Sequence, residues 1–147
     1  MPGRAKSPLP SMAGSLILPR PLVAVRITGP SSSWLRDGLL DTGSVETIFE
    51  QSVAKIIGVD LTHTQSRQIH LTGRKPLRCR YAPVVLRISD GLKETYEWNA
   101  VVGFVNVSLW RPLLGYAGFL QYFDADSHGC DTEVILKPNR AFAGNRI

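Results

Sequence analysis

The sequence predicts an all-β domain, a small closed or nearly closed barrel with one or two short helices. Three observations indicate it. The chain has 147 residues, the usual size of one domain. Its 10 prolines and 13 glycines divide it into short segments, which favour strands over long helices. Several of these segments are continuously apolar or alternate apolar with polar residues, as strands of small barrels do.

The composition excludes several classes of protein. Hydrophobic residues make up 44% and charged residues 20%, which excludes wholesale disorder. No apolar run approaches the roughly 18 residues of a membrane span, so we expect no membrane partner. The run at 16–18 is too short for a signal-peptide core before Pro19. Cys79 and Cys130 are too few for a zinc site or a disulfide scaffold. We expect reduced thiols and a cytoplasmic location.

The first half of the chain predicts three strands and a helix. Residues 1–14 are rich in Pro, Gly, Ser and Ala and are expected to form a flexible leader. Strands are expected at 15–18, 22–28 and 34–40. Between 46 and 57 apolar residues recur at a spacing of three to four, which predicts a short amphipathic helix closed by Gly58.

The second half predicts further strands. A hairpin is expected at 68–72 and 77–89, around the turn 73–76. The other expected elements are one or two strands in 94–107, an apolar run at 113–115, a short helix at 118–123 and a strand at 132–136. Residues 138–147 form a polar tail, expected to be loose because of Pro138 and Gly144. The domain proper is therefore expected to span 15–137.

The sharpest chemical feature is the sequence Leu-Leu-Asp-Thr-Gly-Ser at 39–44. Two leucines carry a strand into the interior, and the carboxylate of Asp41 stands at its end. Gly43 lets a ligand approach the backbone where a side chain would collide. The plain alternative is a strand that ends in an Asx-type turn, which Asp-x-Gly often forms. Thr47-Ile48-Phe49 and a second apolar element, Leu113-Leu114-Gly115, favour a built site instead.

On these residues the sequence resembles the retropepsin-like (retroviral-type) aspartic proteases, most closely their bacterial single-domain members. The markers are 40–44, Thr47-Ile48, and Leu113-Leu114-Gly115 followed by Gly118-Phe119-Leu120. The resemblance implies an acid-protease barrel with one half-site per chain. It also implies that Asp41 is one half of a catalytic pair, and that two chains form a homodimer with the active site on the two-fold axis.

The chemistry of peptide hydrolysis also requires two carboxylates. Peptide hydrolysis by carboxylates needs two of them, one as general base toward water and one as general acid toward the carbonyl oxygen. Like charges so close cannot both ionise, so their proton affinities separate and activity is expected to be greatest at mildly acidic pH. This sequence has a single Asp-Thr-Gly. Two chains must therefore meet, or the loop is not catalytic.

The remaining site residues follow from this assignment. Thr42 is expected to brace the paired loops, and the hydroxyl of Ser44 to bond within the loop. An extended polypeptide is expected to bind between the loop at Val45 and Glu46 and a flap formed by the hairpin tip. The expected flap residues are Leu71, Thr72, Gly73 and Arg74. An ordinary solvent-facing hairpin is the alternative for this tip.

One departure from the retroviral pattern concerns the dimer. Retroviral enzymes usually carry an acidic residue two positions after the glycine and an arginine directly after the later glycine. The matching residues here are Val45 and Tyr116. Both partners of the polar pair are absent together, so no lone charge is stranded. This favours a dimer with apolar contacts, or a non-proteolytic peptide-binding or dimerisation module on the same fold.

Other features have simpler interpretations. The net charge is +5, and its densest cluster, between Arg67 and Arg80, lacks a nucleic-acid-binding motif, so a solvated loop is favoured there. The acidic run from Asp124 to Asp131 has no EF-hand frame and is expected to be a solvated turn, with no metal and no cofactor. Trp34, Trp98 and Trp110 are expected to be core or interface anchors.

Overall fold

The fold consists of eleven strands, one α-helix and one 3₁₀-helix within the described residues, which in this computed structural model are 16–18, 22–71, 73–89, 94–128 and 133–147. The expected leader and Thr72 lie outside these ranges. The first elements are β1 (Leu16–Leu18), β2 (Leu22–Thr28), β3 (Ser33–Leu40), β4 (Ile48–Glu50), α1 (Gln51–Ile57) and β5 (Ser66–Ile69). The others are β6 (Leu77–Ser89), β7 (Thr95–Val105), β8 (Leu113–Leu114), η3 (Leu120–Tyr122), β9 (Phe123–His128), β10 (Glu133–Pro138) and β11 (Asn145–Arg146).

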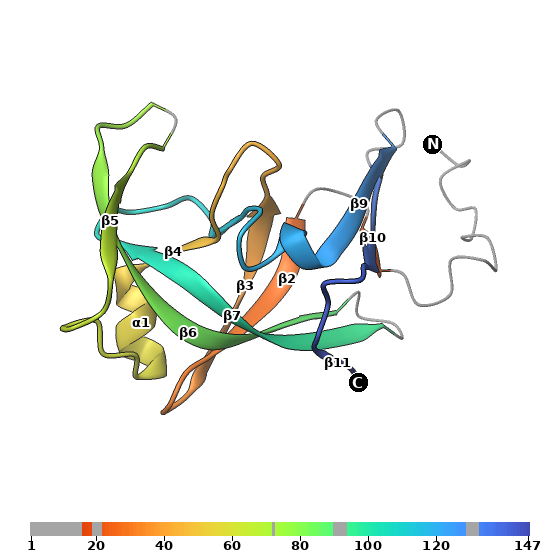
Figure 1. Cartoon of the computed structure of the whole chain (residues 1–147), viewed down its shortest axis with the longest axis horizontal. Helices are drawn as coiled ribbons and strands as arrows, with labels where there is room; N and C mark the ends of the chain where they lie inside the picture. Colours follow the sequence, from red (N-terminus) through yellow and green to blue (C-terminus); the bar gives the residue numbers. More distant parts are fainter. Residues whose placement is uncertain (1–15, 19–21, 72, 90–93, 129–132) are drawn as a thin grey trace.

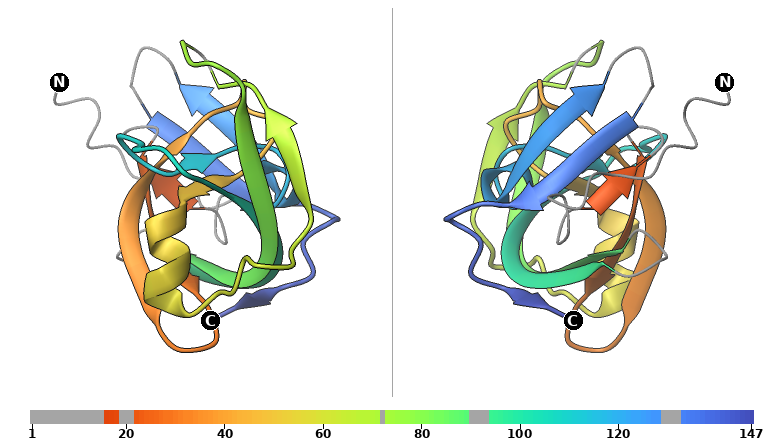
Figure 2. Two further views of the ribbon diagram at one scale, coloured as in Figure 1. Left: turned by 90° about the vertical axis from the view of Figure 1, so that its left-hand side faces the viewer. Right: turned by 90° about the vertical axis from the view of Figure 1, so that its right-hand side faces the viewer.

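Eight strands form one sheet in the order β11-β7-β4-β8-β3-β2-β6-β5. Because β6 also pairs with β7, the strands from β7 through β4, β8, β3 and β2 to β6 form a closed ring. A smaller sheet, β1-β10-β9, lies beside it (Figures 1 and 2). The predicted all-β class with short helices is confirmed. Within the described ranges, no helix is long and apolar enough to cross a membrane.

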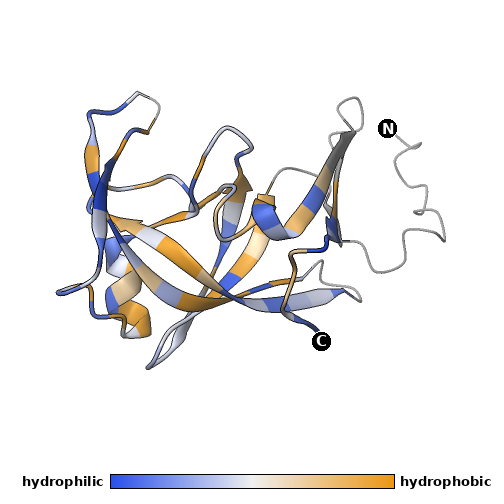
Figure 3. Ribbon diagram, viewed as in Figure 1, coloured by the Kyte–Doolittle hydropathy of each residue, from blue (hydrophilic) through white to orange (hydrophobic). Residues whose placement is uncertain are grey.

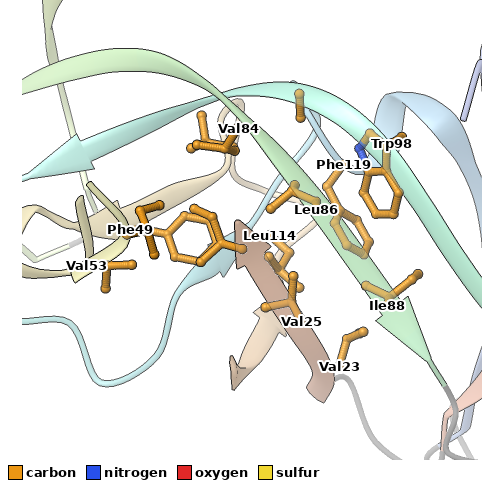
Figure 4. Close-up of a cluster of buried hydrophobic side chains, with 14 of the residues drawn as sticks. Val23, Val25, Phe49, Val53, Val84, Leu86, Ile88, Trp98, Leu114 and Phe119 are labelled. Atoms are coloured by element: carbon orange, nitrogen blue, oxygen red, sulfur yellow. The ribbon is translucent and has the colours of Figure 1, made fainter. Parts of the chain in front are cut away.

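The core lies inside this ring. Buried residues alternate with less buried ones along β2 and much of β6, so one side of each strand faces the core. Figure 3 shows the hydropathy of each residue on the ribbon. Figure 4 shows the buried side chains that meet there from β2, β4, α1, β6, β7 and β8. Trp98 of β7 is 4% exposed and donates from Nε1 to the carbonyl oxygen of Gly118 at 2.9 Å. Trp98 is thus the core anchor that its sequence context predicts.

Two elements differ from the sequence prediction. The expected helix 46–57 is shorter, because Ile48 and Phe49 are fully buried and pair in parallel with Gly103 and Phe104 of β7. That segment is strand β4, and the helix begins only at Gln51. The acidic run expected to be a solvated turn also differs. Residues 123–128 form strand β9, paired along its length with β10.

The C-terminal segment is not the loose tail that Pro138 and Gly144 predict. Strand β11 pairs with β7 through Asn145 opposite Glu97 and Arg146 opposite Tyr96. Phe142 packs edge-on against the rings of Tyr96 and Trp98, with centroids 5.8 and 6.1 Å apart. The segment therefore covers one end of the core, close to the start of β7 (Figure 1).

The packing of Phe142 is testable. Phe142→Ala removes a ring that contacts the Tyr96 and Trp98 rings and also lies 5.4 Å from that of Phe123. We expect a loss of about 2–4 kcal/mol in the free energy of unfolding, measured by urea titration. Arg140→Ala, at an exposed position of the same segment, is the control. A loss below about 0.5 kcal/mol for Phe142→Ala would show that the tail does not contribute to the core.

Candidate active site

Asp41 directly follows β3, and its backbone is fixed by β8. The two strands are parallel, with Leu39 opposite Leu113 and Leu40 opposite Leu114. The Asp41 N–H donates to the carbonyl oxygen of Leu114 at 3.0 Å. The two apolar elements that the sequence singles out, 74 residues apart, therefore lie side by side, and the end of their pairing sets the position of the carboxylate.

The loop after Asp41 is closed by its own hydrogen bonds. Gly43 N–H donates to Asp41 Oδ1 at 3.0 Å, and Ser44 N–H donates to the Asp41 carbonyl oxygen at 3.0 Å. The Ser44 hydroxyl donates to the Glu46 carbonyl oxygen at 2.8 Å. The Asx turn that the sequence offered as an alternative is thus present, and it holds the carboxylate in a fixed orientation. The Ser44 hydroxyl is engaged inside the loop, as expected.

A second set of hydrogen bonds joins the loop to the segment that follows β8. Tyr116 N–H donates to the Ser44 carbonyl oxygen at 3.0 Å, and Ala117 N–H donates to that of Val45 at 2.8 Å. The Thr47 hydroxyl donates to the Ala117 carbonyl oxygen at 2.8 Å. Thr47 is 1% exposed, so this bond lies in a dry environment where it is strong. We call these contacts between 44–47 and 115–117 the loop clasp.

Two glycines of the site have different roles. A Cβ on Gly115 would lie 2.2 Å from the Glu46 carbonyl oxygen and 2.6 Å from that of Ser44, so only glycine fits within the loop clasp. A Cβ on Gly43 would meet a single atom of the described chain, Asp41 Oδ1, at 3.4 Å. Gly43 and Thr42 are exposed. The packing of the chain therefore requires a glycine at 115 but leaves open space outside 43.

A cleft of about 630 Å³ opens beside Asp41. Four of the predicted substrate-binding residues line it: Val45, Glu46, Leu71 and Arg74. Gly73 does not line it; it lies in the hairpin turn with φ +76°, a conformation that favours glycine. The tip of the β5–β6 hairpin and the loop that carries Asp41 lie on the same side of the molecule (Figure 1).

The cleft also has walls outside the predicted substrate-binding residues. They are formed by Ile48, Arg67, Gln68, Ile69, His70, Leu109, Trp110, Arg111 and Leu113. Trp110 was expected to be a core or interface anchor. It is 70% exposed, so it is not a core residue. The one available signal was position, because Leu109-Trp110-Arg111 directly precedes the apolar element that supports Asp41.

Glu46 forms a polar network with Arg67 of β5 and Tyr81 of β6. Arg67 Nη2 pairs with the Glu46 carboxylate, and Arg67 Nε donates to the Tyr81 hydroxyl at 3.3 Å. Burial raises the pKa of the Tyr81 phenol well above its usual range, and a hydrogen bond to Glu46 adds to the shift. Tyr81 therefore stays neutral, and the network joins the active-site loop to both strands of the hairpin.

The basic cluster from Arg67 to Arg80 lies on this hairpin rather than in a solvated loop. Arg74 donates to the Ser108 carbonyl oxygen at 2.8 Å, and Arg78 donates to the Ser66 hydroxyl at 3.2 Å. In the part of the chain that the structure describes, no three His, Cys, Asp or Glu side chains are grouped so as to hold a metal ion.

The comparisons with known proteins agree with this geometry at the level of the fold. No protein-family model matches the sequence, and no significantly similar curated protein was found. Among solved structures, the chain is similar to a retropepsin-like aspartic protease from Rickettsia conorii, with a TM-score of 0.55 and 17% identity. The match covers 84% of this chain and 89% of that one. The chain therefore has the fold of the retropepsin-like aspartic proteases.

The loop clasp predicts opposite behaviour for the two glycines. Gly115→Ala forces a Cβ against two carbonyl oxygens, so we expect the free energy of unfolding to fall by about 1–3 kcal/mol. Gly43→Ala, the matched control, is expected to change it by less than about 0.5 kcal/mol. Thermal unfolding of dilute protein measures both. Equal losses for the two variants would contradict the assignment of the close approach to Gly115.

Proposed function

We propose that this protein is an aspartic endopeptidase of the retropepsin type, which hydrolyses peptide bonds with a water molecule held between two Asp41 carboxylates. The observation that carries the proposal is the setting of Asp41. Its carboxylate stands at the end of the paired strands β3 and β8 and is oriented by the Gly43 N–H, and it lines a cleft large enough for peptide side chains. This setting lies on a fold shared with a retropepsin-like aspartic protease.

The chemistry requires no covalent intermediate. One Asp41 carboxylate accepts a proton from water, whose oxygen attacks the peptide carbonyl carbon, while the other carboxyl group donates its proton to the carbonyl oxygen. The carbon–nitrogen bond then breaks as the first Asp41 gives the amine the proton that it took from water. A hydroxyl of the tetrahedral intermediate returns a proton to the second Asp41 as the carbonyl forms again. In each chain the Gly43 N–H orients its carboxylate at Oδ1 and leaves the other oxygen for the shared proton and the water.

The second carboxylate must come from a second chain. The described lining of the cleft contains only two acidic side chains, and Glu46 is already paired with Arg67. A homodimer with isologous symmetry places the same residue of both chains at its axis. Val45 is 71% and Tyr116 60% exposed, and both are held beside Asp41 by the loop clasp. We therefore propose that these two residues form the apolar part of the dimer contact.

The substrate in this proposal is an extended polypeptide. It would lie between the active-site loop and the β5–β6 hairpin, with its backbone paired to both, and side-chain preference would come from the cleft walls. Val45, Glu46, Leu71 and Arg74 line the cleft on these two sides. Thr42, exposed on the loop, would brace the loop of the second chain.

A non-proteolytic peptide-binding module is the second candidate. The observation that favours it is the apolar pair Val45 and Tyr116, which stands where retroviral enzymes have the charged pair that builds their dimer. A chain that stays monomeric cannot bring two Asp41 side chains together, but its cleft could still hold a peptide strand. The two candidates therefore differ in oligomeric state and in cleavage.

Asp41→Asn tests the proposed activity. We expect cleavage of a mixed peptide library at mildly acidic pH to fall by at least about 10²- to 10⁴-fold, because the amide can neither accept nor donate the shared proton. Peptide fragments are identified by mass spectrometry. Asp60→Asn, the same substitution at an exposed carboxylate outside this cleft, serves as the matched control. An Asp41→Asn variant as active as wild type would overturn the proposal.

Tyr116→Glu tests the proposed dimer contact. Two glutamates would meet near the two-fold axis, so we expect the dissociation constant of the dimer to rise about tenfold or more, which corresponds to about 1.4 kcal/mol. Sedimentation equilibrium measures it. The control is Leu35→Glu. Leu35 is an apolar residue nearly as exposed as Tyr116, and it lies near the start of β3, at the end of that strand away from Asp41. An unchanged dimer in Tyr116→Glu would place the interface elsewhere.

A further inference from the structure

The cleft is lined by three arginines, and two of them donate hydrogen bonds to the chain itself. Arg67 pairs with the Glu46 carboxylate and donates to the Tyr81 hydroxyl. Arg74 donates to the Ser108 carbonyl oxygen at 2.8 Å. The third, Arg111, has no hydrogen bond to any described residue, and its Nε is buried without a partner. A guanidinium carries five N–H donors, so this group is short of acceptors.

The Arg111 guanidinium contacts an aromatic ring and has no carboxylate closer than 4.0 Å among the described residues. The guanidinium lies over the ring of Trp110, 4.8 Å from the ring centroid. The nearest carboxylate is that of Asp37, with Oδ2 4.0 Å from Nη1, the outer limit of an ion pair. The Arg111 side chain is 25% exposed and lines the cleft.

The backbone that carries Arg111 is fixed on both sides. Before it, Leu109 N–H donates to Glu50 Oε2 at 2.9 Å, and the Ser108 carbonyl accepts from Arg74. After it, the Pro112 carbonyl oxygen accepts from Leu39 N–H at 2.8 Å, two residues before Asp41. The guanidinium is therefore presented from a segment tied both to the hairpin and to the strand that ends at the candidate catalytic residue.

We propose that Arg111 selects peptides that carry a carboxylate, by binding it in the part of the cleft bounded by Trp110 and Leu113. The inference rests on the proposed protease function and adds its substrate class. An arginine fork binds a carboxylate through two charge-assisted hydrogen bonds, which supply the acceptors that Arg111 lacks. The two acidic residues that line the cleft cannot fill this role, because Glu46 is held by Arg67 and Asp41 is the candidate catalyst.

The carboxylate could come from an internal Asp or Glu side chain or from the C-terminus of the peptide. The experiment separates these sources. Peptides of about eight residues are synthesised around a bond that wild type cuts in a mixed library, with Glu, Gln or Lys at each position in turn. Each peptide is made with a free C-terminal carboxylate and with a C-terminal amide. The value of kcat/KM is measured for each, with wild type and with Arg111→Gln.

We expect one position at which wild type prefers Glu over Gln by about tenfold, and we expect Arg111→Gln to abolish that preference while it still cuts the Gln peptides. Arg87→Gln is the control and should keep the preference. Arg87 of β6 pairs with Glu97 of β7 and does not line the cleft. A preference that follows the free C-terminus instead would assign the carboxylate to the chain end. Equal rates with Glu and Gln at every position and with both chain ends would overturn the inference.

A reversed-charge variant keeps the proposal testable if Arg111→Gln folds poorly. Arg111→Glu should shift the preference at the same position from Glu to Lys, a gain that a merely damaged protein cannot show. Failure of the protease proposal looks different, because wild type would then cut no peptide in the mixed library. Cleavage by wild type without any dependence on peptide charge would leave the protease proposal standing and remove only the role of Arg111.

Discussion

The site depends on the loop clasp, in which the backbone of 44–47 meets that of 115–117. Tyr116 and Ala117 donate to the carbonyl oxygens of Ser44 and Val45, and Gly115 lets the two segments approach without a side chain between them. The clasp continues the parallel pairing of β3 with β8, so the end of that pairing places Asp41 at the cleft. Within the loop held in this way, the Gly43 N–H donates to Asp41 Oδ1 and orients the carboxylate.

The charges around the cleft follow from this arrangement. Glu46 enters the loop clasp through its backbone and pairs with Arg67 of β5 through its side chain, so the loop and the hairpin are coupled by one residue. Arg74 ties the hairpin to the segment before β8. Among the described residues, the Asp41 carboxylate has no ion pair, and the Arg111 guanidinium has only the 4.0 Å contact with Asp37. We assign these two groups to catalysis and to substrate selection.

The sequence predicted the part of the structure that local patterns encode. The motif at Asp41 and the run at 113–115 were expected to belong together, and the structure pairs them. Strand β9 was missed because its acidic residues favour a turn, whereas pairing with β10 decides its conformation. The cleft wall at Trp110 and Arg111 and the packing of Phe142 were missed because contacts with residues distant in sequence fix both. For the cleft wall the one sequence signal was its position directly before the apolar element at 113–115.

The central claim is that one active site needs Asp41 from two chains. Wild type is mixed with increasing amounts of Asp41→Asn at fixed wild-type concentration, the chains are allowed to exchange, and peptide cleavage is measured. If two carboxylates are required, mixed dimers are inactive, and activity falls in proportion to the wild-type fraction of all chains. Activity that stays constant as the variant is added, in a mixture shown to form mixed dimers, would contradict the account, because one Asp41 would then suffice.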